Sequence, residues 1–229
     1  MLRNFLDVLS IVILMMTNAK IRPLKVLIVA IVALFVGVHM GVEMYIHRDI
    51  VKPIENSQPK VWYFAYGTNM STRYLSNVRH VGVYLSLPAY VLNYSVTLSE
   101  RGLPGIEPAF ALLTNELQSK AYGVLHQITV QDLKRVIHSE GTAYIIADVE
   151  VHDNNGNTYR AKTLVGTSQL QPPYQASKRY INILLEGATE HGLPLPYIHM
   201  LRETDMIYIP VLSEIVGTLI YLTVIVTSQ

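Results

Sequence analysis

Glu140 is the residue of this chain best placed to move a proton. It follows a segment with helical spacing, 130–138, and precedes a strand-like segment, 143–151. A carboxylate at the end of a helix faces the negative end of the helix dipole, which disfavours its charged form. If such a group is also partly buried, it can accept and release a proton near neutral pH. On residue type alone, the alternative is a solvated glutamate at a helix end.

A glycine-containing loop, Tyr66-Gly67-Thr68-Asn69, directly follows the strand-like run Val61–Ala65. It precedes Ser71–Ser76, which can begin a helix. A tight turn between a strand and a helix points several backbone N–H groups into one small volume. Those donors suit a carboxylate or a developing oxyanion. Most loops of this kind are simple turns, so the loop alone does not establish a site.

Several other chemistries lack the residues that they need. The 229 residues include no cysteine, which excludes a thiolate nucleophile, a disulfide scaffold and sulfur-ligated zinc. The sequence contains no dinucleotide-binding glycine fingerprint, no phosphate-binding loop and no serine-nucleophile elbow. The eight histidines are scattered, so we expect no metal site and no cofactor. The formal net charge of +1, with no basic tract, gives no indication of nucleic-acid binding.

Together, the loop and the glutamate resemble those of the γ-glutamylcyclotransferase family. In that family a Tyr-Gly-Ser-Asn loop follows the first strand, and a later glutamate acts as acid and base. Here Thr68 takes the place of the serine, and Glu140-Gly141 with Tyr144 matches the glutamate segment. Because Asn69 follows Thr68, the loop differs from the Tyr-Gly-Ser-Leu loop of the related glutathione-specific branch.

The resemblance extends over about Val61 to Leu201, with the family's motifs in order. The further matching segments are Glu107-Pro108-Ala109-Phe110-Ala111, Ala121-Tyr122-Gly123-Val124, Ser177-Lys178-Arg179-Tyr180 and Glu190-His191-Gly192-Leu193-Pro194. The resemblance implies an α+β fold, a mainly antiparallel, β-barrel-like γ-glutamylcyclotransferase fold with flanking helices.

The resemblance also implies a reaction on a small γ-glutamyl substrate, without a cofactor. The free α-amine would attack the γ-carbonyl of the same molecule and release 5-oxoproline and an amine or amino acid. Glu140 would move the protons, and backbone N–H groups of the loop would hold the α-carboxylate or the carbonyl oxygen. The substrate-binding residues would be Tyr66, Gly67, Thr68, Asn69 and Tyr144, the two tyrosines shaping the pocket and donating hydroxyl hydrogen bonds.

Two alternatives stay open at this point. One is an enzyme on the same scaffold that acts on γ-glutamyl amines or on a γ-glutamylated secondary metabolite. The other is a membrane-tethered binding module that keeps the fold and has no turnover. The presence of Glu140, the loop and Tyr144 together favours an enzyme. The sequence does not indicate the leaving group, the pathway or the oligomeric state.

Short periodic segments make up the domain that must position these residues. Val130–His138 is expected to be a helix with Thr129 as its N-cap and Asp132 at the third position. A second helix is expected at Ser177–His191, closed by Gly192. The strand-like runs are Val61–Ala65, Tyr84–Leu98, Phe110–Thr114, Ala121–Ile128, Ala143–Val151 and Thr158–Val165. The last two flank Asp153-Asn154-Asn155-Gly156-Asn157, which predicts a hairpin with a type I′ turn.

Both ends of the chain are apolar. The segment Val26–Val42 carries no formal charge and lies between Lys25 and Glu43, which predicts a transmembrane helix over 24–45. We expect the remaining parts to be an apolar or interfacial segment over 1–23, a linker over 46–60, the catalytic domain over 61–202 and a possible second membrane segment over 206–226. An amphipathic helix or an apolar strand is the alternative for that last segment, because Glu214 interrupts it.

These segments predict a membrane protein, single- or double-pass, with the lipid bilayer as a partner. The distribution of basic residues slightly favours a cytoplasmic N-terminus and places the domain across the membrane. A glycosylation sequon begins at Asn69, and a glycan there would block the loop. This argument favours a domain on the cytosolic side. The two arguments oppose each other, so the side on which the domain lies stays open.

Overall fold

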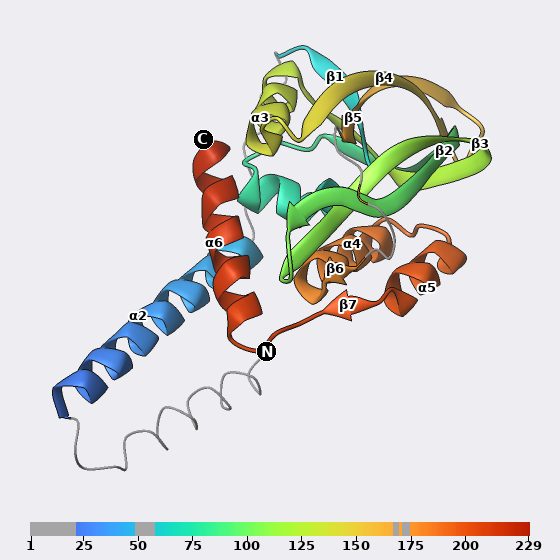
Figure 1. Ribbon diagram of the computed structural model, residues 1–229. Helices are drawn as coiled ribbons and strands as arrows, with labels where there is room; N and C mark the ends of the chain where they lie inside the picture. Colours follow the sequence, from blue (N-terminus) through green and yellow to red (C-terminus); the bar gives the residue numbers. More distant parts are fainter. Residues whose placement is uncertain (1–21, 49–57, 167–169, 171–174) are drawn as a thin grey trace.

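The computed structural model describes residues 22–48, 58–166, 170 and 175–229 (Figure 1). Its centre is a closed five-stranded barrel with the strand order β1-β3-β2-β4-β5. Neighbouring strands are antiparallel except β1 and β5, whose parallel pairing closes the barrel. The strands are β1 Lys60–Ala65, β2 Leu85–Leu103, β3 Glu107–Thr129, β4 Tyr144–Asp153 and β5 Thr158–Gly166. The expected mainly antiparallel, barrel-like fold with flanking helices is confirmed.

Helices and two short strands surround the barrel. The α-helices are α2 Arg22–His47, α3 Val130–Glu140, α4 Lys178–Glu190, α5 Leu195–Glu203 and α6 Leu212–Thr227. A 3-10 turn, η1 Thr68–Met70, and a π-helical turn, η2 Tyr74–Val78, follow β1. The strands β6 Ala176–Ser177 and β7 Met206–Ile207 form a separate parallel pair. Helices α4 and α5 lie together on one side of the barrel (Figure 1).

The helix ends follow the capping residues in the sequence. The side chains of Thr129 and Ser177 accept hydrogen bonds from the backbone N–H groups of Asp132 and Tyr180. Helix α3 therefore begins after its expected cap, and Ser177, expected as the first residue of the second helix, is the cap of α4. Gly192, with a φ of +62°, follows α4 in the left-handed region that favours glycine.

The expectation of two separate strands at Phe110–Thr114 and Ala121–Ile128 is wrong. Both belong to the single long strand β3, which runs through the polar residues between them. An irregularity in the pairing with β2 accommodates those residues: Gln118 and Asn93 both have positive φ, and the Gln118 N–H donates to Asn93 Oδ1 at 3.1 Å. A bulge of this kind lets a strand continue past residues that disturb its alternation.

The hairpin between β4 and β5 forms as expected, but its turn is not type I′. A type I′ turn needs positive φ at two central residues, and only Gly156 has one, at +85°. The Gly156 N–H donates to the Asp153 carbonyl, as in a type I turn followed by a glycine bulge. The Asp153 carboxylate accepts from the N–H groups of Asn155 and Asn157 and stabilises this form of the turn.

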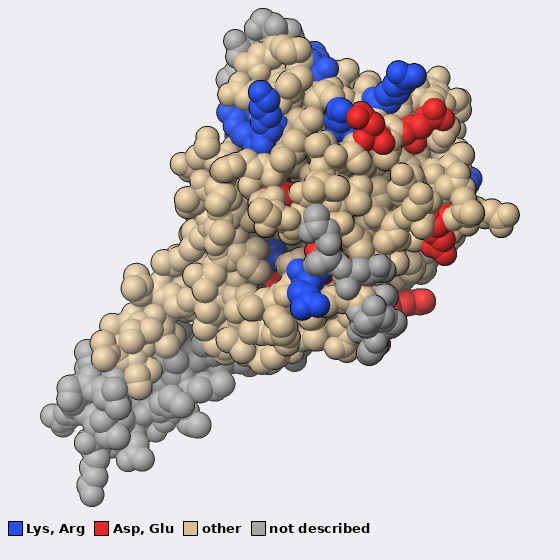
Figure 2. All heavy atoms as spheres, turned by 45° about the horizontal axis from the view of Figure 1, so that its top comes forward, with Lys and Arg blue, Asp and Glu red and all other residues tan. Residues whose placement is uncertain are grey.

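Helix α2 contains an 18-residue stretch, Ala30–His47, that is long and apolar enough to cross a membrane. A signal sequence or a buried core helix would pass the same test, but only 11% of this stretch is buried. Its last turns contact the domain through Val42 and Ile46, and its remainder projects away (Figure 1). On the face shown in Figure 2, the charged side chains gather over the barrel.

The segment 206–226 divides into β7 and the 16-residue helix α6. Helix α6 lies beside α2, where His39 Nδ1 is 2.7 Å from Thr218 Oγ1. The second membrane span stays a prediction. The interfacial segment over 1–23 and most of the linker over 46–60 lie outside the described residues.

Candidate active site

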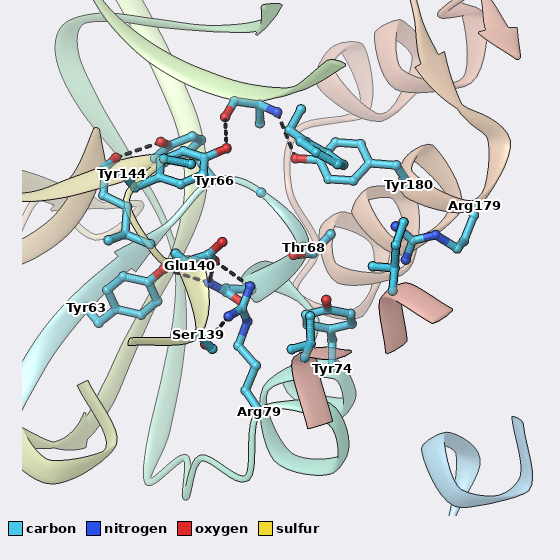
Figure 3. Close-up of a pocket in the computed structure, with 18 of the residues that line it drawn as sticks. Tyr63, Tyr66, Thr68, Tyr74, Arg79, Ser139, Glu140, Tyr144, Arg179 and Tyr180 are labelled. Atoms are coloured by element: carbon cyan, nitrogen blue, oxygen red, sulfur yellow. Dashed lines mark hydrogen bonds and ion pairs between the residues drawn. The ribbon is translucent and has the colours of Figure 1, made fainter. Parts of the chain in front are cut away.

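The six residues singled out in the sequence meet around one cavity of about 210 Å³ (Figure 3). Tyr66, Gly67, Thr68 and Asn69 lie in and just before η1, Glu140 ends α3, and Tyr144 begins β4. The other lining residues come from η2, α3, the barrel strands, α4 and α6: Tyr63, Tyr74, Arg79, Arg101, Phe110, Ala111, Ser139, Ala143, Leu164, Arg179, Tyr180, Ile220 and Val224.

The position of Glu140 follows from the residue after it. Gly141 adopts a φ of +64°, which is easy for glycine and ends α3 at Glu140. The carboxylate is partly buried, with 18% of the side chain exposed, and Oε1 lies 2.5 Å from Arg79 Nη2. Asn69 Nδ2 also donates to Oε1, at 3.3 Å. The charge of Arg79 therefore offsets the helix dipole that disfavours this carboxylate.

Arg79 is a further candidate for a functional residue, which no motif in the sequence indicates. It follows the π-helical turn η2, and only 4% of its side chain is exposed. Its guanidinium donates to Ser139 Oγ as well as to Glu140. Burial lowers the pKa of Arg79, but the Glu140 carboxylate and nearby tyrosines raise it, and the net shift is upward. Arg79 is a permanent cation beside the carboxylate.

Asn69 connects the loop to this ion pair. Its Nδ2 donates to Tyr63 Oη at 2.9 Å in addition to Glu140, whereas its Oδ1 is buried without a partner. Among the backbone hydrogen bonds of turns, loops and caps in the described residues, none is donated by the N–H of Gly67, Thr68 or Asn69. These N–H groups are therefore candidate donors to a bound molecule.

The pocket tyrosines are neutral hydrogen-bonding groups. Tyr66 and Tyr144 donate to the backbone carbonyls of Leu164 and Ala111, at 2.6 and 3.0 Å. The hydroxyl protons of these two tyrosines are therefore already bonded to backbone carbonyl groups, which the sequence does not indicate. Burial raises the pKa of both phenols, and Tyr180 is shifted in the same direction for the same reason. None of these phenols is a base at neutral pH.

Helix α4 contacts the residues that directly follow the loop. Ser71 Oγ donates to Glu186 Oε1 at 2.9 Å, and the Thr72 N–H donates to Glu190 Oε2 at 3.1 Å. Gly187 permits this contact, because a Cβ there would lie 2.5 Å from the Ser71 nitrogen. On the other side, His126 Nε2 lies 3.0 Å from the Asn69 carbonyl.

Glu140 is the only carboxylate among the described residues that line the cavity. The residues with resolved placement contain no group of three His, Asp or Glu side chains that could hold a metal ion. The arrangement supplies one acid or base, a fixed cation and a row of backbone donors. Such a site suits proton transfer on a substrate that carries its own nucleophile.

Several known proteins are similar to this chain in sequence or in fold. Residues 120–201 match the AIG2-like family. The chain is 26% identical over 172 residues to γ-glutamyl cyclotransferase aclK of Aspergillus oryzae, covering 66% of this chain and 63% of that protein. It is 24% identical over 168 residues to human γ-glutamylcyclotransferase, covering 69% of this chain and 84% of the human protein. The chain is thus similar in sequence to γ-glutamylcyclotransferases.

A solved γ-glutamyl cyclotransferase structure shares the fold of this chain, with a TM-score of 0.59 and 21% identity. The superposition covers 70% of this chain and 98% of that structure. The chain spans 63% and 57% of the lengths of the two fungal relatives that it matches, aclK and gliK of Aspergillus fumigatus.

Proposed function

We propose that this chain catalyses intramolecular cyclotransfer of a γ-glutamyl group. The products are 5-oxoproline and a free amine or amino acid. The observation that carries the proposal is the isolated Glu140 carboxylate, held by Arg79 and Asn69 beside the loop that follows β1. The similarity of the chain to γ-glutamylcyclotransferases supports the same reaction class.

In this mechanism Glu140 accepts a proton from the α-ammonium group of the substrate. The freed amine attacks the γ-carbonyl carbon, and a carbon–nitrogen bond forms to close the five-membered ring. The tetrahedral intermediate collapses when the bond to the leaving nitrogen breaks and Glu140 returns its proton to that nitrogen. The ring nitrogen gives its remaining extra proton to Glu140, which passes it to the released amine or to water. One carboxylate can serve both steps if it reaches each nitrogen in turn.

The protein's other contribution is to hold the substrate in a reactive conformation. The N–H groups of Gly67, Thr68 and Asn69 bind the α-carboxylate or the oxygen that becomes negative in the intermediate. Tyr66 and Tyr144 form the wall of the pocket. Ring closure within one molecule needs orientation more than an external nucleophile, so no cofactor takes part.

The test is release of 5-oxoproline by the full chain from a panel of γ-glutamyl amino acids, γ-glutamyl amines and glutathione. The Glu140→Gln variant is expected to lose at least about 100-fold in kcat, because loss of a general acid–base typically costs that much. Glutamine keeps an acceptor for Arg79, so the variant should still fold, as circular dichroism would show. Activity within a few-fold of the wild type would contradict the role of Glu140.

We also propose that α2 attaches the domain to a membrane. The part of α2 before Val42 has about 20 residues, which is roughly 30 Å of helix and matches the hydrocarbon core of a bilayer. Many of its apolar side chains are exposed, among them Leu27, Ile31 and Leu34. Burial of these groups in lipid would remove an unfavourable contact with water.

A further inference from the structure

The C-terminal helix α6 forms part of the wall of the candidate active site, although it lies outside the segment that resembles the family. Ile220 and Val224 both line the cavity. They are four residues apart, so they lie on the same face of the helix. Both side chains are half-buried, whereas Leu219 and Val226 on other faces of α6 are 56% and 69% exposed.

Specific contacts seat α6 at this position. Gly217 faces Arg179, and a Cβ on Gly217 would lie 2.9 Å from Arg179 Cδ, so the close approach depends on the missing side chain. The Arg179 guanidinium lies 5.1 Å from the centre of the Tyr221 ring. The Tyr221 ring in turn lies 6.2 Å from the ring of Tyr74. The helix is thus packed against α4 and η2.

The cavity has two parts with different linings, and in the second part aliphatic side chains of α6 lie beside Arg179 and Tyr74. Glu140, Arg79 and the loop form the polar part, and Tyr74 and Arg179 lie on another side, next to α6 (Figure 3). Arg179 is neutralised there by Glu107, whose Oε1 lies 2.7 Å from Arg179 Nε. Ile220 and Val224 add aliphatic surface to this second part.

We infer that α6 is the specificity wall for the leaving group, and that the preferred substrates are γ-glutamyl compounds whose leaving amine carries an apolar side chain. This inference rests on the proposed function. The γ-glutamyl half bears an ammonium, a carboxylate and the reacting carbonyl, and it is the same in every substrate of the class. We therefore place the γ-glutamyl half against the polar residues of the cavity. The side chain of the leaving amine, which differs between substrates, then lies against the apolar wall.

The experiment compares γ-glutamyl-leucine with γ-glutamyl-glycine on the full chain. A hydrophobic pocket discriminates a methylene group by about 10–200-fold, so wild-type kcat/KM should favour the leucine compound by at least about 10-fold. In the Ile220→Thr/Val224→Thr variant, the ratio of the two kcat/KM values should fall about 10-fold. The matched control, Leu219→Thr/Val226→Thr, changes exposed residues of the same helix and should keep the wild-type ratio.

A second measurement separates this inference from the reaction itself. Calorimetric binding of both compounds to Glu140→Gln, with and without the α6 substitutions, reports the preference without turnover. Lack of 5-oxoproline release would reject the proposed reaction. Even then, tighter binding of the leucine compound that depends on Ile220 and Val224 would support α6 as the wall of the leaving-group pocket. Equal kcat/KM and equal binding for the two compounds would overturn the inference. So would an equal loss for both compounds in the α6 variant, or the same loss of preference in the control.

Discussion

Arg79 fixes the electrostatic state of the site. Its charge is almost fully buried, and Glu140 is its anionic partner at 2.5 Å. A buried charge that loses its partner cannot recover its hydration, so the cost of breaking such a pair is large. The pair therefore couples the stability of the fold to the integrity of the candidate catalytic group.

A double-mutant cycle tests this coupling. We expect Arg79→Met to lower the free energy of unfolding by about 3 kcal/mol, because Glu140 is left partly buried without its cation. In the Arg79→Met/Glu140→Gln protein, the total loss should be smaller than the sum of the two single losses. Denaturant unfolding of the four proteins measures this difference. Strict additivity would show that the two side chains do not interact.

His126 makes the fold sensitive to acid. It is fully buried, its Nδ1 lies 2.8 Å from Ser86 Oγ, and its ring contacts that of His191. Burial, followed by the charge of His191, lowers the pKa of His126 to about 3 from its ordinary 6.5. The folded state therefore holds this histidine neutral, whereas the unfolded state binds a proton once the pH falls below about 6.5.

The neutral, buried His126 makes the stability of the fold fall as the pH falls. The stability contribution is fully present above pH 6.5 and is lost as the pH falls toward 3, by at most about 1.4 kcal/mol per pH unit. We expect the urea midpoint to fall over this range, and to fall less steeply in His126→Gln. His191, whose pKa is also lowered by burial, should leave a residual slope in that variant. Parallel pH profiles for the two proteins would exclude His126 as a source.

At the scale of elements, the contact between η1 and α4 sets the position of the loop. Gly187 lets α4 approach Met70 and Ser71 more closely than any side chain would allow. We expect Gly187→Ala to cost about 1–3 kcal/mol, as overpacking does, and to reduce kcat by displacing Asn69 from Glu140. The matched control is Gly37→Ala in α2, where a Cβ meets nothing within 4 Å. Thermal unfolding and 5-oxoproline release check both variants; equal behaviour of the two would show that the contact is not tight.

Local signals in the sequence predicted the elements that local physics determines. The caps at Thr129 and Ser177 mark where α3 and α4 begin, because side-chain oxygens satisfy the first backbone N–H groups. The break expected within β3 was wrong because pairing with β2 resumes on both sides of the polar stretch, at Asn115 and at Lys120. Alternation patterns carry no information on such pairing.

The site was predictable only where its residues share a motif. The loop and Glu140 stand in recognisable short segments, and the structure brings them to one cavity. Arg79 follows a π-helical turn with no motif of its own, 61 positions before its partner in the sequence. Ile220 and Val224 reach the cavity through the packing of a helix that the sequence pattern associates with membranes. Long-range contacts of this kind appear only in three dimensions.

In the molecule as a whole, α2 contributes to the stability of the domain as well as to the proposed membrane attachment. Its C-terminal turns bury Val42 and Ile46 against η2 and α4. Asn77 Nδ2 donates to the carbonyls of Ile46 and Arg48, at 2.5 and 2.7 Å, and so satisfies groups that the helix end leaves free. Before these turns, His39 Nδ1 lies 2.7 Å from Thr218 Oγ1 of α6.

Two truncations separate these roles. A chain of residues 42–229 keeps the buried turns, and we expect it to stay folded and active while it no longer floats with lipid vesicles. A chain of residues 56–229 also loses Ile46 and Arg48, and we expect a lower melting temperature as well. Flotation and thermal unfolding of the two truncations and the full chain measure both effects. Vesicle binding by the 42–229 chain would show that α2 is not the anchor.

The parallel pairing of β1 with β5 has a consequence for how the protein is made. Tyr63 pairs with Lys162, so the two sides of the closing seam lie almost one hundred positions apart in the chain. At a synthesis rate of about 5–20 residues per second, β1 leaves the ribosome roughly 5–20 s before its last neighbour exists. Throughout that interval one edge of β1 has no partner, and an open edge is a template for pairing with other chains. Aggregation of the nascent chain is therefore a hazard that the completed barrel no longer carries, and slower translation should increase it.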